Sequence, residues 1–330
     1  MELKDTFNRS HDYLRISLTE RCNLRCTYCM PEEGVALSPK PKIMNVDEIL
    51  GISKVFVDQG IKKIRLTGGE PLVKRGIDRI LKGLSSYDIE LSITTNAVIL
   101  DQHLDILKST GVRNLNISID TLQKEKFRII TRRDHYSRVM NVIQKVQADP
   151  FFNVKLNAVL IKGFNDDEIV DFIELTRDMN IGMRFIEFMP FNGNQWEVDK
   201  LVSDQKVLET LQAYYGPSVI QRLQDKQNDT SRNYRIGDYK GSFALISTVT
   251  NPFCDSCNRI RLMANGKIKN CLFSPGETDI LGPYREGKDI VPIIQSSLLK
   301  KHQSRGGLSA DSDFINPDKH NNRSMIMIGG

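Results

Sequence analysis

Short apolar runs alternate with amphipathic stretches along the first two thirds of the chain. Six of the runs have the β-branched and aliphatic character of strands, at residues 14–18, 64–67, 91–95, 114–119, 154–161 and 184–188. Between them, apolar residues recur at helical spacing over residues 46–56, 77–84, 104–107 and 166–179. Asn45 is suited to cap the first of these helices, and Gly111 is suited to end the third.

Six strand-then-helix units predict a parallel sheet joined by right-handed crossovers. A closed barrel of this kind has eight units, so the pattern favours an open or partial barrel. We therefore expect an α/β fold in which residues 1–216 form a partial (β/α)6 TIM-like barrel. In parallel sheets, active-site residues gather at the C-terminal ends of the strands.

The pattern changes after about Pro217. Residues 222–235 are polar and are expected to form a loop, 234–236 and 242–249 have strand character, and 290–299 is predicted to be helical. A hairpin is predicted over residues 260–269, because Asn265-Gly266 favours a tight turn. Residues 217–330 are therefore expected to form a separate C-terminal module that ends in Gly329-Gly330.

Composition narrows the functional classes. The chain of 330 residues is 40% hydrophobic, enough for a core, and its net charge of +5 is too small to favour nucleic acid. No apolar run reaches the ~20 residues that span a bilayer. The N-terminal segment carries Glu2 and Asp5 and has no apolar stretch, unlike a secretory signal or a transit peptide. We expect a cytoplasmic protein that binds neither nucleic acid nor a membrane.

The six cysteines form two triplets, with none between them and none left over. In a reducing compartment, clustered cysteines bind metal more often than they pair as disulfides. A structural zinc site wants four protein ligands, and a cubane [4Fe–4S] cluster has four corners. Three thiolates would leave one iron open to a small molecule. The triplets are Cys22, Cys26 and Cys29 (C-x3-C-x2-C), and Cys254, Cys257 and Cys271 (C-x2-C-x13-C).

The first triplet follows the first predicted strand, and Tyr28 precedes its last cysteine. His11 lies before that strand, on the wrong side to complete a zinc site. The triplet resembles that of the radical S-adenosylmethionine (SAM) superfamily, as does Gly68-Gly69-Glu70-Pro71 after the second strand. Glycines allow close backbone approach, and Glu70 is suited either to accept from an ammonium group or to secure the loop.

The resemblance covers nearly the whole chain, from about residue 12 to residue 330. The second triplet, the Arg259-Ile260-Arg261 that follows its second cysteine, and the terminal Gly-Gly resemble the GTP 3′,8-cyclase (molybdenum cofactor biosynthesis protein A) family. Further segments similar to that family are Arg15-Ile16-Ser17, Ile64-Arg65-Leu66-Thr67, Ile93-Thr94-Thr95-Asn96, Ile117-Ser118-Ile119-Asp120, Val154-Lys155-Leu156-Asn157 and Arg184-Phe185-Ile186-Glu187-Phe188-Met189.

The resemblance implies roles for the matching residues. The first triplet would hold a [4Fe–4S] cluster, and the second triplet would hold an auxiliary [4Fe–4S] cluster whose open iron meets guanine. The cofactor SAM would be bound by Tyr28, Gly69, Glu70, Ser118 and Met189. The substrate would be surrounded by Lys63, Arg65, Thr94, Lys155, Arg184, Arg259 and Arg261, with Arg15, Arg259 and Arg261 as catalytic residues. Cations inside strands are unusual unless they face an anion, and a triphosphate is such an anion.

The implied reaction converts GTP to (8S)-3′,8-cyclo-7,8-dihydroguanosine 5′-triphosphate, an early step of molybdenum cofactor biosynthesis. Reductive cleavage of SAM would give a 5′-deoxyadenosyl radical, which removes hydrogen from C3′ so that C3′ attacks C8 of the same guanine. The implied partners are GTP, a small-molecule or protein electron donor, and the next enzyme of the pathway. A homodimer is also compatible with the sequence.

Two other interpretations are open on the residues alone. A radical peptide-modifying enzyme usually carries more than three C-terminal cysteines. A zinc-bound adaptor or nucleic-acid-binding protein would use the second triplet as half of a zinc ribbon, against which stand the missing fourth ligand and the mild net charge. One departure from the family is Ala97, where a glycine is usual. A left-handed turn at Ala97 would be strained.

Overall fold

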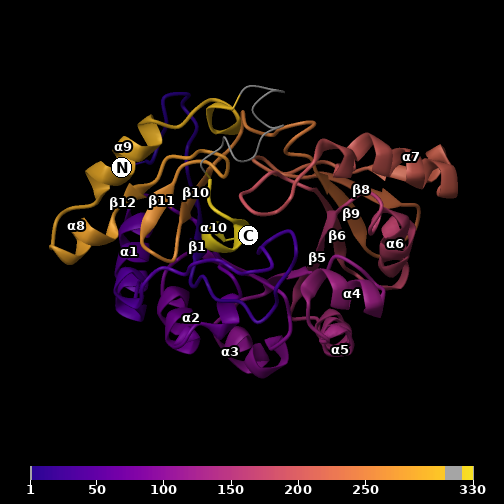
Figure 1. Ribbon diagram of the computed structural model, residues 1–330, viewed down its shortest axis with the longest axis horizontal. Coiled ribbons are helices and arrows are strands. Elements are labelled where there is room, and N and C mark those ends of the chain that lie inside the picture. The colour runs from indigo at the N-terminus through magenta and orange to yellow at the C-terminus, as the bar shows by residue number, and fades with distance from the viewer. Residues whose placement is uncertain (1, 309–321, 330) are drawn as a thin grey trace.

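The strands of the protein form one sheet that curves around a central space, with helices outside it (Figure 1). The computed structural model describes residues 2–308 and 322–329. Within these residues the sheet has 12 strands in the order β12-β11-β10-β1-β2-β3-β4-β5-β6-β9-β8-β7. Because the two outermost strands do not pair with each other, the barrel is partial.

The first six strands pair in chain order, each parallel to the next. This confirms the expected α/β barrel with six parallel strands, and the predicted bounds shift by only one or two residues. The strands are β1 (Tyr13–Ser17), β2 (Lys63–Thr67), β3 (Glu90–Thr95), β4 (Asn114–Ser118), β5 (Asn153–Leu160) and β6 (Gly182–Glu187).

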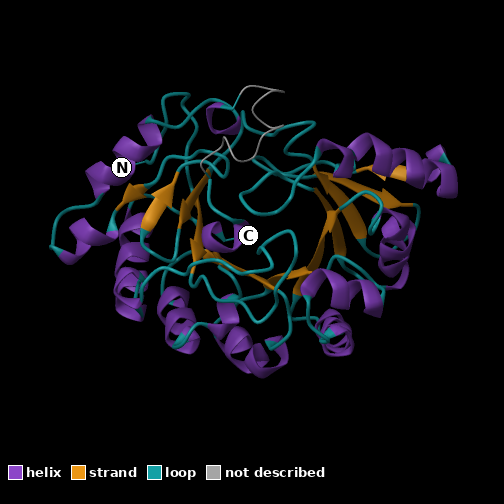
Figure 2. Cartoon of the chain, viewed as in Figure 1, coloured by secondary structure: helices purple, strands orange, loops and turns teal. Residues whose placement is uncertain are grey.

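Helices cover the outer face of these strands (Figure 2). The cap predicted at Asn45 is confirmed, because its side chain accepts from Glu48 N at 2.9 Å while the Glu48 carboxylate accepts from Asn45 N at 2.8 Å. The helices that follow the strands are α1 (Val46–Asp58), α2 (Ile77–Ser85), α3 (Leu104–Ser109), α4 (Lys124–Thr131), α5 (Tyr136–Gln147), α6 (Ile169–Asp178) and α7 (Asp204–Tyr215). Short 3-10 turns are η1 (Lys40–Lys42), η2 (Pro71–Val73), η3 (Leu100–His103), η4 (Asp166–Glu168), η5 (Val198–Lys200), η6 (Pro217–Val219) and η7 (Arg305–Gly307).

The strands of the C-terminal module extend the same sheet at both edges. On one side β9 (Ser242–Ile246) runs parallel to β6, followed by antiparallel β8 (Arg232–Ile236) and β7 (Ile220–Arg222). On the other side β10 (Arg259–Leu262) runs parallel to β1, followed by antiparallel β11 (Lys267–Lys269) and β12 (Thr278–Asp279). The expected module is therefore continuous with the barrel, and the boundary at residue 217 stays a prediction.

The prediction of a polar loop over residues 222–235 is wrong at both ends of that range, because the first residue belongs to β7 and the last residues belong to β8, which pair with each other. Tyr234 stacks on Phe243 of β9 with ring centroids 5.2 Å apart, and Arg222 covers the other side of the Tyr234 ring at 5.0 Å. Aromatic contacts between residues distant in the sequence thus stabilise the polar segments of β7 and β8 as strands. The predicted hairpin between β10 and β11 is confirmed, and Gly266 takes φ +70° in its turn. The remaining helices are α8 (Leu281–Arg285), α9 (Val291–Leu299) and α10 (Met325–Ile328).

Alternation along each strand separates an apolar core from a polar interior. Leu14 and Ile16 of β1, and Ile64 and Leu66 of β2, are almost fully buried in the core that packs on the helices. The intervening residues point to the other face of the sheet and line the concave side. A second, smaller apolar cluster of Phe188, Phe191, Trp196, Phe273 and Ile328 brings the C-terminal segment against the loops that follow β6. No helix in the described ranges is long and apolar enough to cross a membrane.

Candidate active site

The first cysteine triplet lies in the loop after β1, and the glycine motif after β2 holds that loop by backbone contacts. Gly69 N donates to Thr19 O at 2.7 Å, and Glu70 N donates to Arg21 O at 2.8 Å. A Cβ atom on Gly69 would lie 2.3 Å from Arg21 O. Glycine is therefore required where the two loops meet.

Glu70 is fully buried, and both of its carboxylate oxygens accept hydrogen bonds from the protein. One accepts from Leu72 N at 3.1 Å and from Thr95 Oγ1 at 2.8 Å, and the other accepts from Asn96 N at 2.8 Å. Burial raises the pKa of Glu70 to about 7, although these hydrogen bonds oppose the increase. Of the two roles expected for Glu70, securing the loop is the one these contacts perform.

The loop held by Glu70 contains the strained residue. Ala97 takes φ +62° and is completely buried, so the left-handed turn is kept without the usual glycine. Ala97 N donates to Thr95 Oγ1 at 3.1 Å, and Leu100 N donates to Ala97 O at 3.2 Å. The hydrogen bonds of the turn hold Ala97 in a conformation that costs an L-residue of order 1 kcal/mol.

The first triplet is half-buried and is contacted by neutral donors. Cys22 Sγ accepts from Leu24 N at 3.4 Å and from Asn96 Nδ2 at 3.5 Å. Burial raises the pKa of the Cys22 thiol to about 11, and it also raises the pKa values of Cys26 and Cys29. Iron must therefore displace protons from these thiols when it binds.

Tyr28 links the cluster loop to the next strands. Its hydroxyl donates to Asp120 Oδ2 at 2.8 Å, and Asp120 Oδ1 accepts from Val159 N at 2.9 Å. Burial raises the pKa of Asp120 to about 6. Ser118 ends β4, and Met189 follows β6, where its carbonyl accepts from Asn194 Nδ2 at 2.7 Å. The predicted SAM residues thus share the end of the barrel that carries the first triplet.

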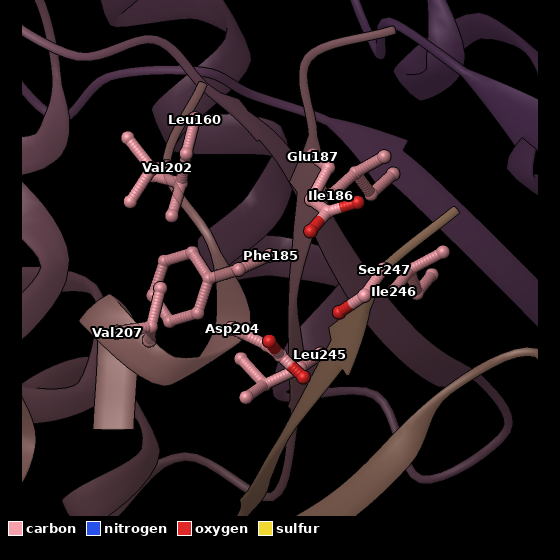
Figure 3. Close-up of a pocket in the computed structure, with 10 residues that line it drawn as sticks. All are labelled: Leu160, Phe185, Ile186, Glu187, Val202, Asp204, Val207, Leu245, Ile246 and Ser247. Atoms are coloured by element: carbon pink, nitrogen blue, oxygen red, sulfur yellow. The ribbon is translucent and has the colours of Figure 1, made fainter. Parts of the chain in front are cut away.

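An apolar hollow of about 210 Å³ adjoins this end of the barrel. Thr27 and Tyr28 of the cluster loop form one wall, and Ile161 and Phe188, which follow β5 and β6, form another. A second hollow, of about 10 Å³, lies between β6, β9 and the start of α7, and its walls include Phe185, Val207 and Leu245 (Figure 3). That hollow holds at most one water and does not reach the concave face.

Cations stand side by side across four strands of the concave face. Arg15 on β1 lies directly opposite Arg65 on β2 and Arg261 on β10, and Arg261 lies opposite Lys269 on β11. Directly opposite residues have Cβ atoms about 4.5–5.5 Å apart. Burial, together with the neighbouring Arg261, holds the pKa of Arg15 well below its usual value. Burial and Arg259 lower the pKa of Arg261 to about 10.

The rest of the predicted substrate set lies on the same face. Arg184 Nη1 donates to Asn116 Oδ1 at 3.2 Å. Enclosure by the barrel and the charge of Arg184 lower the pKa of Lys155 to about 8, although water reaches its side chain. Thr94 Oγ1 is buried and has no hydrogen-bond partner among the described residues. Lys63 lies at the edge of the set, where it donates to Glu90 Oε1 at 2.7 Å.

The second triplet lies at the opposite end of the barrel from the first. Cys22 follows the C-terminal end of β1, whereas Cys257 precedes the N-terminal end of β10, which is parallel to β1. Cys271 follows β11, which returns antiparallel to β10 and so ends near the same place. The cationic strands therefore run between the two triplets.

Two cationic side chains secure the second triplet. Lys301 Nζ donates to Cys257 Sγ at 3.4 Å, and Arg9 Nη1 donates to Cys254 O at 2.8 Å. Burial raises the pKa of Cys271. Burial also acts to raise the pKa of Cys257, but Arg259 and Lys301 outweigh it and bring that pKa to about 6.

The thiols of each triplet are not arranged around a single point. In the described part of the chain, no three side chains of His, Cys, Asp or Glu are placed to ligate one metal ion. A cubane cluster instead takes each thiolate at a different iron. The donor set of three cysteines with backbone and amide N–H groups directed at sulfur fits such a cluster.

The C-terminal segment, with α10, lies inside the curve of the sheet (Figure 1). Arg261 Nη1 donates to Gly329 O at 2.8 Å, and a Cβ atom on Gly329 would lie 2.7 Å from Thr67 Oγ1. Lys269 Nζ donates to Asn322 Oδ1 at 2.9 Å where the segment begins. Gly330 lies outside the described residues.

Sequence reasoning missed several residues of the site. Asn96 and Asp120 lie inside matching motifs but were assigned no role, although one contacts Cys22 and the other Tyr28. Arg9 and Lys301 carry no local signal, because their contacts with the second triplet span 245 and 44 residues along the chain. Only the folded structure brings them to the site.

Comparisons with known proteins agree with this arrangement. The family model described as Radical SAM superfamily matches residues 16–176, and the one described as Molybdenum Cofactor Synthesis C matches residues 181–306. Among solved structures, Streptococcus suis SuiB bound to S-adenosylmethionine has a TM-score of 0.58 and 17% identity, over 97% of this chain and 78% of that chain. At that identity, the likeness shows the fold.

Curated relatives are similar over almost the full chain. The mitochondrial GTP 3′,8-cyclase of Arabidopsis thaliana is 46% identical over 99% of this chain and 83% of its own length. The GTP 3′,8-cyclase of Listeria monocytogenes is 42% identical over 99% of both chains. Molybdenum cofactor biosynthesis protein 1 of Dictyostelium discoideum is 43% identical over 99% of this chain, which spans only 52% of that relative. The chain therefore belongs to the GTP 3′,8-cyclase family of the radical SAM superfamily.

Proposed function

We propose that this protein converts GTP to (8S)-3′,8-cyclo-7,8-dihydroguanosine 5′-triphosphate in molybdenum cofactor biosynthesis. The observation that carries the proposal is the run of like charges on β11, β10, β1 and β2 between the two cysteine triplets. Like charges directly opposite each other destabilise a sheet, so such a run favours a polyanion bound against it. GTP supplies that charge.

Each triplet is proposed to hold one [4Fe–4S] cluster, the first to bind SAM and the second to bind guanine. When bound and reduced, the first cluster supplies the electron that cleaves SAM, and the cleaved cofactor removes hydrogen from C3′ of GTP. Support for the two sites comes from their free, half-buried thiols and from their positions at opposite ends of β1 and β10. The chain's part is to hold the two reactants at the spacing that the reaction needs.

Within the barrel, Arg15, Arg65, Lys155 and Arg184 are proposed to bind the triphosphate. Each charge-assisted hydrogen bond contributes roughly 1.5–3 kcal/mol. Thr94 and Lys63 are proposed to complete this group, with the ion pair between Lys63 and Glu90 exchanged for phosphate. Arg259 and Arg261, which precede β11 on the side of the second triplet, are proposed to orient the base and its ribose as catalytic residues with Arg15.

The SAM cofactor is proposed to lie at the other end, bound by Tyr28, Gly69, Ser118 and Met189. The apolar hollow beside Tyr28 and Phe188 is suited to its adenine ring. Glu70 is proposed to act by fixing Asn96 and the loop around it, rather than through a free carboxylate.

The proposal includes a small-molecule or protein electron donor and transfer of the product to the next enzyme of the pathway. The cytosol is the proposed compartment, because six reduced cysteines need a reducing environment to take up iron. The Arabidopsis relative is described as mitochondrial, and both settings meet that requirement.

The test is an anaerobic reaction of reconstituted protein with SAM, dithionite and GTP, read by mass spectrometry. The expected products are 5′-deoxyadenosine and an isomer of GTP in which C3′ is joined to C8. Cys26→Ser should yield neither, whereas Cys257→Ser should yield 5′-deoxyadenosine without the cyclised product. Normal cyclisation by Cys257→Ser would overturn the role of the second triplet. A colourless protein that holds zinc would return the adaptor interpretation.

A further inference from the structure

Among the residues that the structure describes, Lys301 is a buried cation without a carboxylate partner. Its side chain follows α9 and is only 4% exposed. The ammonium donates to Cys257 Sγ at 3.4 Å and to Arg259 O at 3.1 Å. Among the ion pairs formed by residues 2–308 and 322–329, none includes Lys301. A buried charge is costly unless a counter-charge compensates it.

The other charged groups nearby do not provide that compensation. Asp5, which contacts Arg9 of this region, already accepts from Arg9 at 2.6 Å and from His11 at 3.1 Å. Arg9 and Arg259 are themselves cations. Among the described residues, the anions that act on Lys301 are the thiolates of Cys257 and Cys271, together with a cluster that they would hold.

Within residues 2–308 and 322–329, no cation lies at hydrogen-bond distance from the first triplet. In the described part of the chain, the donors to its sulfurs are neutral groups: the Leu24 backbone, the amide of Asn96 and the hydroxyl of Tyr28. Its charged neighbours are of both signs, the carboxyl groups of Asp120 and Glu70 and the guanidinium group of Arg25. The two sites thus differ in that a cationic side chain is hydrogen-bonded to a sulfur of the second triplet.

We propose that Lys301 is the counter-ion of the second cluster and holds its reduction potential above the value that three cysteines alone would give. The inference rests on the proposed function, which assigns that cluster to the second triplet. A positive charge stabilises the reduced cluster, because the reduced form carries one more electron. Hydrogen bonds to sulfur and local charge are established determinants of iron–sulfur potentials.

The test measures the potential directly. A protein with Cys22, Cys26 and Cys29 replaced by alanine retains only the second site. It is reconstituted with iron and sulfide and titrated with dithionite under electron paramagnetic resonance. In this protein, Lys301→Met removes the charge and Lys301→Gln keeps a neutral donor. Lys301→Arg keeps the charge. Lys300→Met, at the exposed neighbouring residue, is the control.

In Lys301→Met, the ratio of reduced to oxidised cluster at a fixed potential is expected to fall about tenfold. This corresponds to a reduction potential lower by about 59 mV for one electron. Lys301→Gln should also lower the reduction potential, whereas Lys301→Arg and the control Lys300→Met should keep a potential near that of the parent. If Lys301→Met takes up no iron, the comparison of the potentials of Lys301→Gln and Lys301→Arg tests the inference instead. Equal potentials in all variants, or loss of the cluster from all three Lys301 variants, would overturn the inference. If the parent itself binds no iron, the assignment of the second cluster fails instead.

Discussion

Arg15 on β1 lies directly opposite Arg65 on β2, and both guanidinium groups face the inside of the barrel. Arg65 Nε donates to Ser92 Oγ at 3.3 Å, and its guanidinium lies 5.5 Å from the centre of the Tyr13 ring. These contacts of Arg65 are neutral, so an anion bound at the two arginines would relieve the repulsion between them. The repulsion between the two arginines therefore lowers the stability of the free protein, while the same two arginines form the anion-binding site.

Arg65→Met should therefore weaken GTP binding and stabilise the free protein. We expect the Kd for GTP to rise about 10- to 100-fold, the equivalent of one lost charge-assisted contact. The melting temperature without GTP should rise by a few degrees. Anaerobic calorimetry and thermal melts measure both. Arg79→Met, which breaks an exposed pair with Asp47, is the control and should change neither. If Arg65→Met made the free protein less stable and left its affinity for GTP unchanged, this account of Arg65 would be wrong.

Lys155 should make GTP affinity depend on pH. Because enclosure and Arg184 bring its pKa to about 8, the free protein loses this charge as the pH rises through 8. Bound triphosphate favours the charged form, so the Kd for GTP should increase above about pH 8 and be flatter below it. Lys155→Arg stays charged and should flatten the profile up to about pH 9.5. An unchanged profile in Lys155→Arg would mean that another group titrates.

Gly69→Ala should disrupt the first site while leaving the second. The added Cβ atom would lie 2.3 Å from Arg21 O, which is backbone and cannot give way easily. Iron bound after reconstitution should fall by about half, because each [4Fe–4S] site holds the same amount. Gly276→Ala is the control, since its Cβ would meet only Ser274 Oγ at 3.4 Å. Full iron content in Gly69→Ala would show that the two loops can separate without loss of the cluster.

Arg9→Met should destabilise the protein strongly. Arg9 joins buried Asp5 to three backbone carbonyls around the second triplet, those of Cys254, His302 and Gln303. Removing one partner of a buried pair costs about 3–5 kcal/mol. The double variant Asp5→Asn/Arg9→Met should lose less than the sum of the single changes. Urea unfolding of the four proteins gives the coupling, and strict additivity would contradict a direct pair.

The six parallel strands could be predicted because each carries a local signal in its apolar residues, and its neighbours follow in chain order. The positions of the cysteines and strand cations likewise follow from motifs. The hairpin of β7 and β8 could not be predicted, because its stability comes from Tyr234 packing on Phe243 of a later strand. Nor could the pairing of β1 with β10, which joins Tyr13 to Arg259 across most of the chain.

The same distance along the chain explains why Lys301 was not recognised. A lysine after a helix is ordinary until the fold sets its ammonium 3.4 Å from Cys257 Sγ. Glu70 shows the reverse case. Its motif carries a local signal, but whether the carboxylate faces a ligand or the protein depends on Thr95 and Asn96 at the end of another strand.

The pairing of β1 with β10 also bears on how the protein is made. β1 is among the first strands to leave the ribosome, but its second edge stays unpaired until residues 259–262 of β10 have been synthesised. Contacts so distant in sequence are slow to form. During synthesis, the nascent chain therefore exposes an unpaired edge next to three free thiols. Chaperones and the iron–sulfur assembly machinery would meet the first triplet before the second one exists.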